Sequence, residues 1–199
     1  HAASPAGTTR DTADLPPLSG LLDQVREETS LARMLEIHQR GDLDVDLTAV
    51  PGVRPWAAAV IARELEPTGG VVLVATATGR EAEDLAASLR SLLPPESVAV
   101  FPSWETLPHE RLSPAADVVG RRFKVLHEMP RVIVAAARAV CQPVLPVIDP
   151  IVIARDHEYD FTQLTESIAR FAYEHVDMVA KRGEFATRGG LIDVFPTTA

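Results

Sequence analysis

Hydrophobic residues recur along the middle of the chain in two alternating patterns, which predict a succession of helices and strands. Short, continuous apolar runs at residues 71–75, 98–101 and 131–135 are typical of strands buried on both faces of a sheet. Apolar residues at helical spacing predict helices at residues 55–65, 80–93, 118–128 and 136–140. This alternation predicts an α/β domain in which helices cover both faces of a parallel sheet.

The N-terminal pattern is different. Residues 1–17 are rich in Ala, Thr, Pro and Asp without periodicity, so we expect a disordered leader. Residues 18–40 have helical spacing and predict two helices or one bent helix, which Gly41 ends. Residues 43–50 alternate polar and apolar side chains and predict a short strand.

Two nearby prolines, Pro143 and Pro146, mark the predicted domain boundary, because neither a helix nor a central strand continues through them. We therefore expect a first domain at residues 18–146 and a second at residues 147–199.

The second domain is predicted to be a small α+β unit with an antiparallel sheet. Its pattern indicates a strand at residues 151–154 and an amphipathic helix at 161–171, with Thr162 as a possible cap. Further strands are expected at residues 174–179, 185–188 and 191–195, with a hairpin turn at 181–183. Gly189 and Gly190 indicate either a second tight turn or a bulge within one long strand, and we favour the bulge.

Two arginines, Arg182 and Arg188, stand on this predicted sheet. A planar guanidinium held at a fixed backbone position suits recognition of a carboxylate or a phosphate. The sheet is therefore the predicted partner-binding surface.

Composition and charge narrow the classes of function. The chain has 199 residues and a net charge of −9, which argues against a protein whose main task is to grip a nucleic-acid backbone. No apolar run is long enough for a membrane span, no secretory pattern begins the chain, and no metal-ligand spacing occurs, so we expect a cytoplasmic protein without a metal. The single cysteine, Cys141, forms no intrachain disulfide and is expected to be buried.

The turn between the strand at 71–75 and the helix at 80–93 is where a phosphate-binding loop would lie. A working loop has the pattern GxxxxGK[ST]. Aligned on Gly79, this chain has Val74 for the first glycine, Arg80 for the lysine and Glu81 for the hydroxyl residue. A carboxylate there repels phosphates, so we expect a helix start with Glu81 complementing the helix dipole, and no cofactor.

The segment after the strand at 98–101 contains polar side chains that offer an enzymatic alternative. His109 would be a general base, oriented by Glu105 or Glu110. An ordered loop packed by Trp104 over the sheet edge is the favoured interpretation, because no nucleophile or metal cluster accompanies these residues. A solvated basic face is expected from the following cluster: Arg111, Arg121, Arg122 and Lys124.

Two motifs carry a resemblance to a known family. Residues 182–196, RGEFATRGGLIDVFP, resemble a signature of the second domain shared by UvrB and the bacterial transcription-repair coupling factors (Mfd). Residues 101–114, FPSWETLPHERLSP, with VGRR at 119–122, resemble the coupling factors more closely than UvrB. The resemblance covers about residues 55–199. It implies a first domain that is helicase-like, similar to that of UvrB, and has a degenerate P-loop. It also implies that the chain is truncated within the second domain.

The resemblance implies a recruitment function. In the family the second domain binds UvrA, and an arginine at the position of Arg188 is central to that contact. We expect Phe185, Arg188 and Gly189 to contribute, with Arg182 as a rim charge; many UvrB sequences have another arginine where this chain has Ala186. The ATP and magnesium site, the DNA translocase motor and the contacts with RNA polymerase belong to downstream domains of the full-length family protein.

Two alternatives stay open. One is a UvrB-type, ATP-dependent DNA helicase fragment; the other is an unrelated α/β domain whose glycine-arginine hairpin serves another protein. We also expect the sheet of the incomplete second domain to have an exposed edge that is prone to self-association.

Overall fold

The structure is a computed structural model that describes residues 16, 18–40, 44–106, 114–144, 149–171 and 173–197. Contacts group the chain into two compact units, residues 1–100 with 130–134 and residues 101–129 with 135–199. The predicted leader lies outside the described residues, apart from Pro16, and so does Pro146 of the predicted domain boundary.

The N-terminal helical region forms two helices, as one of the two alternatives predicted. Helix α1 spans Leu22–Arg26 and α2 spans Thr29–Gln39, after a short 3-10 turn at Ser19–Leu21. The Glu28 carboxylate accepts hydrogen bonds from the backbone N–H groups of Ser30 and Leu31 and so caps α2.

Helix α3, Arg54–Leu65, is joined to α1 by surface ion pairs. Arg26 pairs with Glu64, and Arg63 lies 2.9 Å from Asp23. Helix α4 spans Gly79–Arg90, so it ends three residues earlier than predicted.

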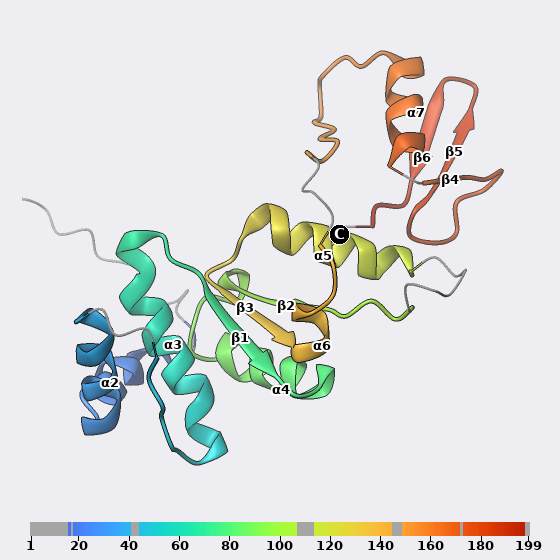
Figure 1. The fold of residues 1–199 in the computed structure, drawn as a ribbon. Coiled ribbons are helices and arrows are strands. Elements are labelled where there is room, and N and C mark those ends of the chain that lie inside the picture. Colours follow the sequence, from blue (N-terminus) through green and yellow to red (C-terminus); the bar gives the residue numbers. More distant parts are fainter. Residues whose placement is uncertain are drawn as a thin grey trace, which may run out of the picture. The chain divides into compact units, whose positions relative to one another are not determined.

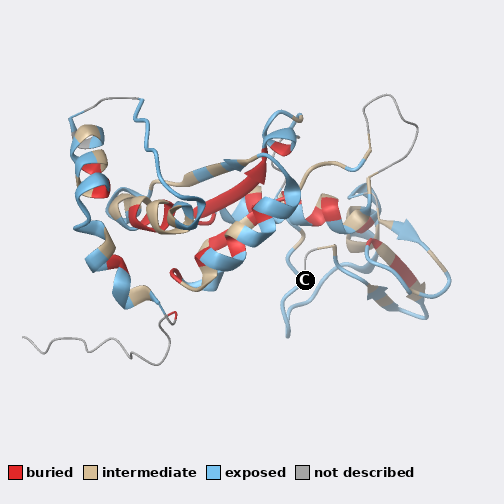
Figure 2. Ribbon diagram, turned by 90° about the horizontal axis from the view of Figure 1, so that it is seen from below, coloured by how far each residue is buried: buried red, intermediate tan, exposed pale blue. Residues whose placement is uncertain are grey.

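The strand predicted at residues 43–50 is wrong for the described part, residues 44–50, which have no regular secondary structure. Every residue of this segment is exposed, and the segment is pale blue in Figure 2. Alternating apolar residues alone do not make a strand, because its backbone groups need a hydrogen-bonded neighbour.

The first sheet contains three parallel strands in the order β1-β3-β2 (Figure 1). Their bounds are Val72–Thr76 for β1, Val98–Phe101 for β2 and Val132–Ala136 for β3. The central strand, β3, is buried at all five positions, as its continuous apolar run predicted. The predicted α/β class is confirmed, and the hydrophobic core of this unit joins the sheet to helices α3 and α4, with buried members that include Ala59, Val60, Ala86, Leu89, Val132 and Val134.

Helices α5, Ala116–Glu128, and α6, Ala137–Val140, complete the predicted alternation. Cys141, directly after α6, is exposed, so the prediction of a buried thiol is wrong. Only Ala139 of this four-residue helix is buried, so most side chains of this apolar run do not face the core.

Arg122 of α5 is buried, with 2% of its surface exposed, so its assignment to a solvated basic face is wrong. Its guanidinium lies between two aromatic rings, with Cζ 4.0 Å from the centroid of Phe101 and 4.2 Å from that of Trp104. Its nitrogens donate to the carbonyl oxygens of Pro102, at 2.7 Å, and Pro143, at 3.4 Å. Burial lowers the pKa of Arg122 below its ordinary value, yet an arginine stays protonated.

The loop that begins at Pro102 is held at Trp104. The Gln142 side chain accepts from the backbone N–H of Trp104, at 2.7 Å, and donates to its carbonyl oxygen, at 3.3 Å. Trp104 thus packs on Arg122 and is fixed by Gln142. The residues of the enzymatic alternative, His109 and Glu110, lie outside the described part of the chain, as does Arg111.

The C-terminal sheet has the order β4-β5-β6, and helix α7, Phe161–Arg170, precedes it. Its strands span Glu174–His175 for β4, Glu184–Arg188 for β5 and Leu191–Val194 for β6. Strands β5 and β6 are antiparallel, but β4 and β5 are parallel, so the sheet is mixed and residues 181–183 do not form a hairpin turn.

Two further local predictions for this region are wrong. Residues 151–154 have no regular structure, although the hydroxyl of Tyr159 accepts a hydrogen bond from the N–H of Ala154. Helix α7 is capped by Asp160 instead of Thr162, because the Asp160 carboxylate accepts from the N–H of Gln163 at 2.8 Å.

Gly120 of α5 lies where the backbone of Thr197 approaches the helix. A Cβ atom added at Gly120 would lie 2.3 Å from the carbonyl oxygen of Thr197. Tyr173 fixes the same residue, because its hydroxyl oxygen accepts from the Thr197 N–H at 3.1 Å. The missing side chain of Gly120 therefore permits this close approach.

Replacing Arg122 by alanine is expected to lower the free energy of unfolding by about 3 kcal/mol. The Pro102 carbonyl oxygen loses its donor, the Pro143 carbonyl oxygen keeps only the Trp104 indole N–H, and the Phe101 and Trp104 rings lose the guanidinium between them. Arg122→Lys should recover only part of the loss, since an ammonium cannot stack as a plane between two rings. Urea unfolding followed by circular dichroism measures both. Lys124→Ala, on the exposed side of α5, is the control, and an Arg122→Ala protein as stable as this control would contradict the assignment.

Gly120→Ala is expected to destabilise the protein by about 1–3 kcal/mol, since the new methyl group meets a backbone oxygen that cannot rotate away. The usual effect of this exchange inside a helix is a gain of about 1 kcal/mol, so the sign is diagnostic. Gly79→Ala in α4, where an added Cβ meets no atom within 4 Å, is the matched control. Equal melting temperatures for the two variants would refute the close approach.

Candidate functional site

The candidate partner-binding site is the hairpin of β5 and β6. Arg188 pairs with Leu191, and the two glycines between them have positive φ values of 53° and 91°. Such a two-residue loop is a tight turn, so the favoured bulge is wrong and the alternative of a second turn is correct. Gly189 therefore contributes the backbone conformation that ends β5 directly after Arg188.

Arg188 extends from the last position of β5 and is exposed. Its Nη2 atom donates to Oδ2 of Asp193 on β6 at 2.9 Å, and 60% of the Arg188 side chain and 53% of the Asp193 side chain are accessible. Among the described residues, the Asp193 carboxylate is the one ionic partner of Arg188. The remaining guanidinium N–H groups give this position the capacity to bind an acidic group on another molecule.

Phe185, the second expected contact residue, is buried. Its ring lies 4.8 Å from the ring of His175 on β4, whose Nε2 atom is 3.0 Å from the hydroxyl oxygen of Thr187. The structure thus places Phe185 beneath the hairpin, where it supports β5 and offers little surface to a partner.

Arg182, the expected rim charge, is engaged within the chain. Its guanidinium lies 5.3 Å from the centroid of the Phe195 ring, and its Nη1 atom donates to the carbonyl oxygen of Pro196 at 3.1 Å. Both contacts lie at the end of β6 opposite the turn. Arg182, two residues before β5, and Arg188, at the end of β5, are therefore not brought together into one cluster.

An exposed apolar side chain beside Arg188 was not predicted as a site residue. Leu191, paired with Arg188, is 71% exposed. An exposed apolar residue beside an arginine is typical of a protein-binding surface. The period-2 pattern of β6 contained the signal for Leu191, but it required the turn to be placed correctly.

Glu184 holds the segment that leads into β5. Its carboxylate accepts hydrogen bonds from the backbone N–H groups of Ala180 and Lys181, both at 2.7 Å. These bonds favour the charged form and lower the pKa of Glu184 below its ordinary value. The start of the candidate site is therefore fixed by a charge-assisted contact.

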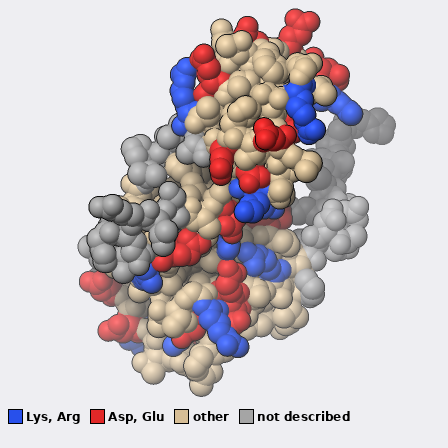
Figure 3. Space-filling view, turned by 90° about the vertical axis from the view of Figure 1, so that its right-hand side faces the viewer, with Lys and Arg blue, Asp and Glu red and all other residues tan. Residues whose placement is uncertain are grey.

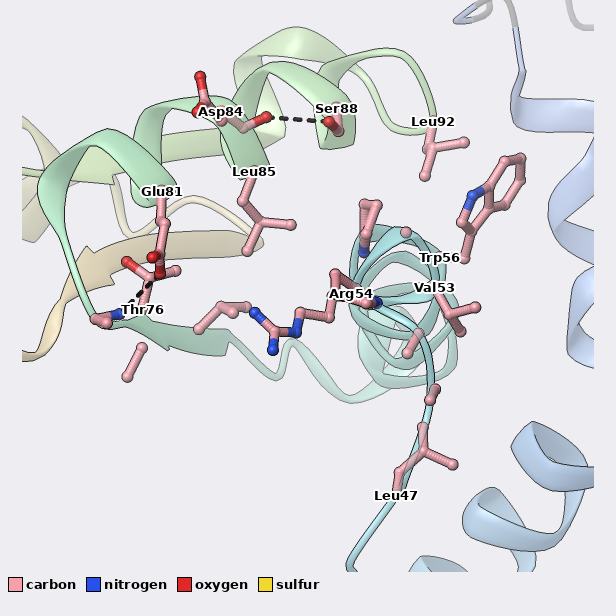
Figure 4. A pocket seen from close by; sticks show the side chains of 18 of the residues that line it. Leu47, Val53, Arg54, Trp56, Thr76, Glu81, Asp84, Leu85, Ser88 and Leu92 are labelled. Atoms are coloured by element: carbon pink, nitrogen blue, oxygen red, sulfur yellow. Dashed lines mark hydrogen bonds between the residues drawn. The ribbon is translucent and has the colours of Figure 1, made fainter.

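The degenerate phosphate loop lies beside a cavity of about 1150 Å³ in the first unit. Thr78 caps α4 by accepting from the N–H of Glu81, and the Glu81 carboxylate accepts from the N–H of Ala77 at 3.2 Å. The carboxylate thus takes a loop N–H that a phosphate would need, as Figure 4 shows. Arg54 extends from the start of α3 toward β1 in the same view.

The residues of this loop do not fit a nucleoside triphosphate. Val74 lies within β1, Gly79 and Arg80 open α4, and the negative charge of Glu81 is directed at the backbone of the loop. Phosphates approaching the same N–H group would be repelled by that carboxylate. The expectation that no cofactor binds to this fragment stays a prediction.

No group of three or more His, Cys, Asp or Glu side chains in the described part of the chain is arranged to hold a metal ion. Likewise, none of the described helices is both long and apolar enough to cross a bilayer.

The hydrogen bonds that the Glu184 carboxylate accepts from Ala180 and Lys181 predict that stability depends on pH. Its pKa is lowered in the folded state, so its contribution to stability is present above the unfolded-state value of 4.5 and is lost as the pH falls through the lower folded-state value. The difference in unfolding free energy between the wild type and Glu184→Gln should therefore shrink between about pH 5 and pH 3. Urea unfolding across this range tests it, and a difference that stays constant with pH would show that the charge is not involved.

Comparison with known proteins connects the hairpin to a family. Residues 151–199 match the family of UvrB interaction domains, and this range contains the whole C-terminal sheet. The chain is 36% identical over 197 residues to the transcription-repair-coupling factor of Mycobacterium tuberculosis, which covers 92% of this chain and 16% of that protein. The coupling factors of Escherichia coli, 32% identical over 47% of this chain, and Bacillus subtilis, 29% identical over 60%, are also similar.

The chain spans less than a fifth of the length of these curated relatives, 16% for the mycobacterial protein and 9% for that of Escherichia coli. The matched range, residues 151–199, includes the residues expected to bind a partner: Phe185, Arg188 and Gly189. The resemblance seen in the two sequence motifs is thus confirmed: the chain is similar to the transcription-repair-coupling factors over most of its length, and its residues 151–199 match the family of UvrB interaction domains.

Proposed function

We propose that this chain is a non-catalytic recruitment module of a transcription-repair coupling factor, which binds UvrA and so directs nucleotide excision repair to stalled RNA polymerase. The observation that carries the proposal is the position of Arg188. It is an exposed arginine on a tight hairpin, within the segment that matches the UvrB interaction domain.

The geometry of the hairpin supports protein recognition. A two-residue turn fixes Arg188 at the end of a hydrogen-bonded strand, so little backbone ordering remains to be done on binding. Leu191 adds an apolar contact beside the charge. Arginine is one of the residue types enriched at interface hot spots.

The charge distribution supports a protein partner over nucleic acid. The chain has a net charge of −9, and on the face drawn in Figure 3 the Lys and Arg side chains are interspersed with Asp and Glu. A protein that binds the phosphate backbone of DNA needs Lys and Arg side chains clustered on one surface. In this proposal the DNA and RNA polymerase contacts, together with ATP and magnesium, belong to other domains of the full-length protein.

The helicase alternative has less support. A UvrB-type helicase needs a loop that binds ATP. At the corresponding position of this chain, the Glu81 carboxylate already accepts the hydrogen bond of the Ala77 N–H. Self-association through an edge of the C-terminal sheet stays a prediction; β4 and β6 are the edge strands among the described residues.

The proposal is tested by calorimetric titration of UvrA with the 199-residue chain and its Arg188→Ala variant. Loss of a paired interface arginine is expected to cost about 2 kcal/mol or more, a weakening of about 30-fold. Arg170→Ala on α7, an exposed arginine paired with Glu166, is the control and should bind as the wild type does.

Two outcomes would overturn the proposal. One is an absence of UvrA binding by a wild-type chain whose circular dichroism shows an intact fold. The other is binding by Arg188→Ala that is as tight as that of the wild type, which would remove the hairpin as the contact surface.

A further inference from the structure

Asp193 and Arg188 are diagonal neighbours on one face of the β5–β6 hairpin. The register pairs Ala186 with Asp193 and Arg188 with Leu191. Directly paired residues of antiparallel strands point to the same face, and positions two apart on one strand share that face. The 2.9 Å contact between Arg188 Nη2 and Asp193 Oδ2 is therefore a diagonal contact, which the long arginine side chain spans.

The residues directly opposite explain why this diagonal pair forms. Ala186, across from Asp193, has only a methyl group and is buried, with 1% of its surface exposed. Leu191, across from Arg188, carries no charge. Neither member of the pair has an ionic partner directly opposite, so each meets the other across the diagonal.

The pair contributes little to the stability of the fold. Both side chains are more than half exposed, and ion pairs in such surroundings gain little because water screens their attraction. Its effect is geometric instead. An arginine that is free to rotate loses side-chain entropy when a partner immobilises it, and a carboxylate that already holds the guanidinium removes part of that loss.

The contact also leaves binding capacity on the guanidinium. Within the described part of the chain, Asp193 engages one nitrogen of the Arg188 guanidinium, Nη2, whereas a guanidinium has five N–H donors. A planar carboxylate fits the remaining donors as a fork. A doubly charged phosphate would meet the fixed negative charge of Asp193 at close range and would be repelled more strongly.

We propose that Asp193 is a positioning residue that holds the Arg188 guanidinium in the orientation that binds a carboxylate on the partner protein. The inference rests on the proposed function, because it assigns a role to Asp193 in the same contact. The group on the partner that binds Arg188 is an acidic side chain, which reaches the hairpin beside Leu191.

The test measures association and dissociation rates of UvrA with surface-immobilised chain by surface plasmon resonance. Asp193→Asn keeps the shape of the side chain and removes its charge. We expect the dissociation rate to rise about 3- to 10-fold with little change in the association rate, since the arginine must be ordered anew on each binding event. Asp193→Glu should restore part of the affinity.

Two matched comparisons separate positioning from general electrostatics. Glu166→Gln removes a carboxylate from an exposed arginine pair on α7 and should leave both rates unchanged. In an Arg188→Ala background, Asp193→Asn should have no further effect, because the residue that Asp193 positions is gone.

The inference is overturned if Asp193→Asn binds UvrA as tightly as the wild type or more tightly, or if its effect persists in the Arg188→Ala background. A faster association rate without faster dissociation would indicate only a more positive surface, and it would also overturn the positioning role. If inorganic phosphate at millimolar concentration competes with UvrA at this site, the assignment of a carboxylate is refuted.

The failure of this inference is distinct from that of the proposed function. If Arg188→Ala weakens binding and Asp193→Asn does not, only the role of Asp193 falls. If Arg188→Ala itself has no effect, the hairpin is not the contact surface and the proposed function falls with it.

Discussion

The guanidinium of Arg122 is the contact on which the second compact unit depends. It joins the end of β2, the loop at Trp104 and the segment after α6 to helix α5, using two rings and two carbonyl oxygens. Burying a charge is costly unless its polar contacts are replaced, and here flat aromatic faces and backbone dipoles do so. A lysine has neither the planar shape nor the fork of donors for this arrangement.

The same unit brings α5 against the end of the C-terminal sheet. Gly120 lies beneath Thr197, and an added Cβ at Gly183, where φ is 83°, would lie 2.8 Å from Cβ of Ala116. These two glycines allow backbone to approach helix without an intervening side chain. The position of the β5–β6 hairpin on α5 is therefore specified by small residues, while Arg122 fixes α5 itself.

Most of the regular elements followed from the hydrophobic pattern, because their apolar residues are long or continuous runs that pack against the core. Strand β2 was predicted at its observed bounds, and α3 within one residue. The failures were at 44–50 and 151–154, where short apolar runs have no neighbouring strand, and at β4, whose parallel pairing depends on contacts distant in sequence. The burial of Arg122 was likewise set by two rings from another segment, which no local charge pattern reveals.

The candidate site was partly predictable. The motif identified Arg188, but Asp193 became its partner only once the two glycines were placed as a turn, since a bulge changes the register by one residue and moves side chains to the other face. The buried position of Phe185 and the engagement of Arg182 by Phe195 depend on packing that the sequence does not display.

The Glu81 contact with Ala77 has a consequence for how this chain could change over evolutionary time. The loop carries its own anion, so a lysine gained at position 80 alone would be adjacent to a carboxylate on the same helix turn before any phosphate arrived. Glycine at position 74, lysine at 80 and a hydroxyl at 81 would all have to appear, and no single one of these changes provides the complete pattern. With the internal carboxylate in place, no single substitution turns this loop into a phosphate-binding loop.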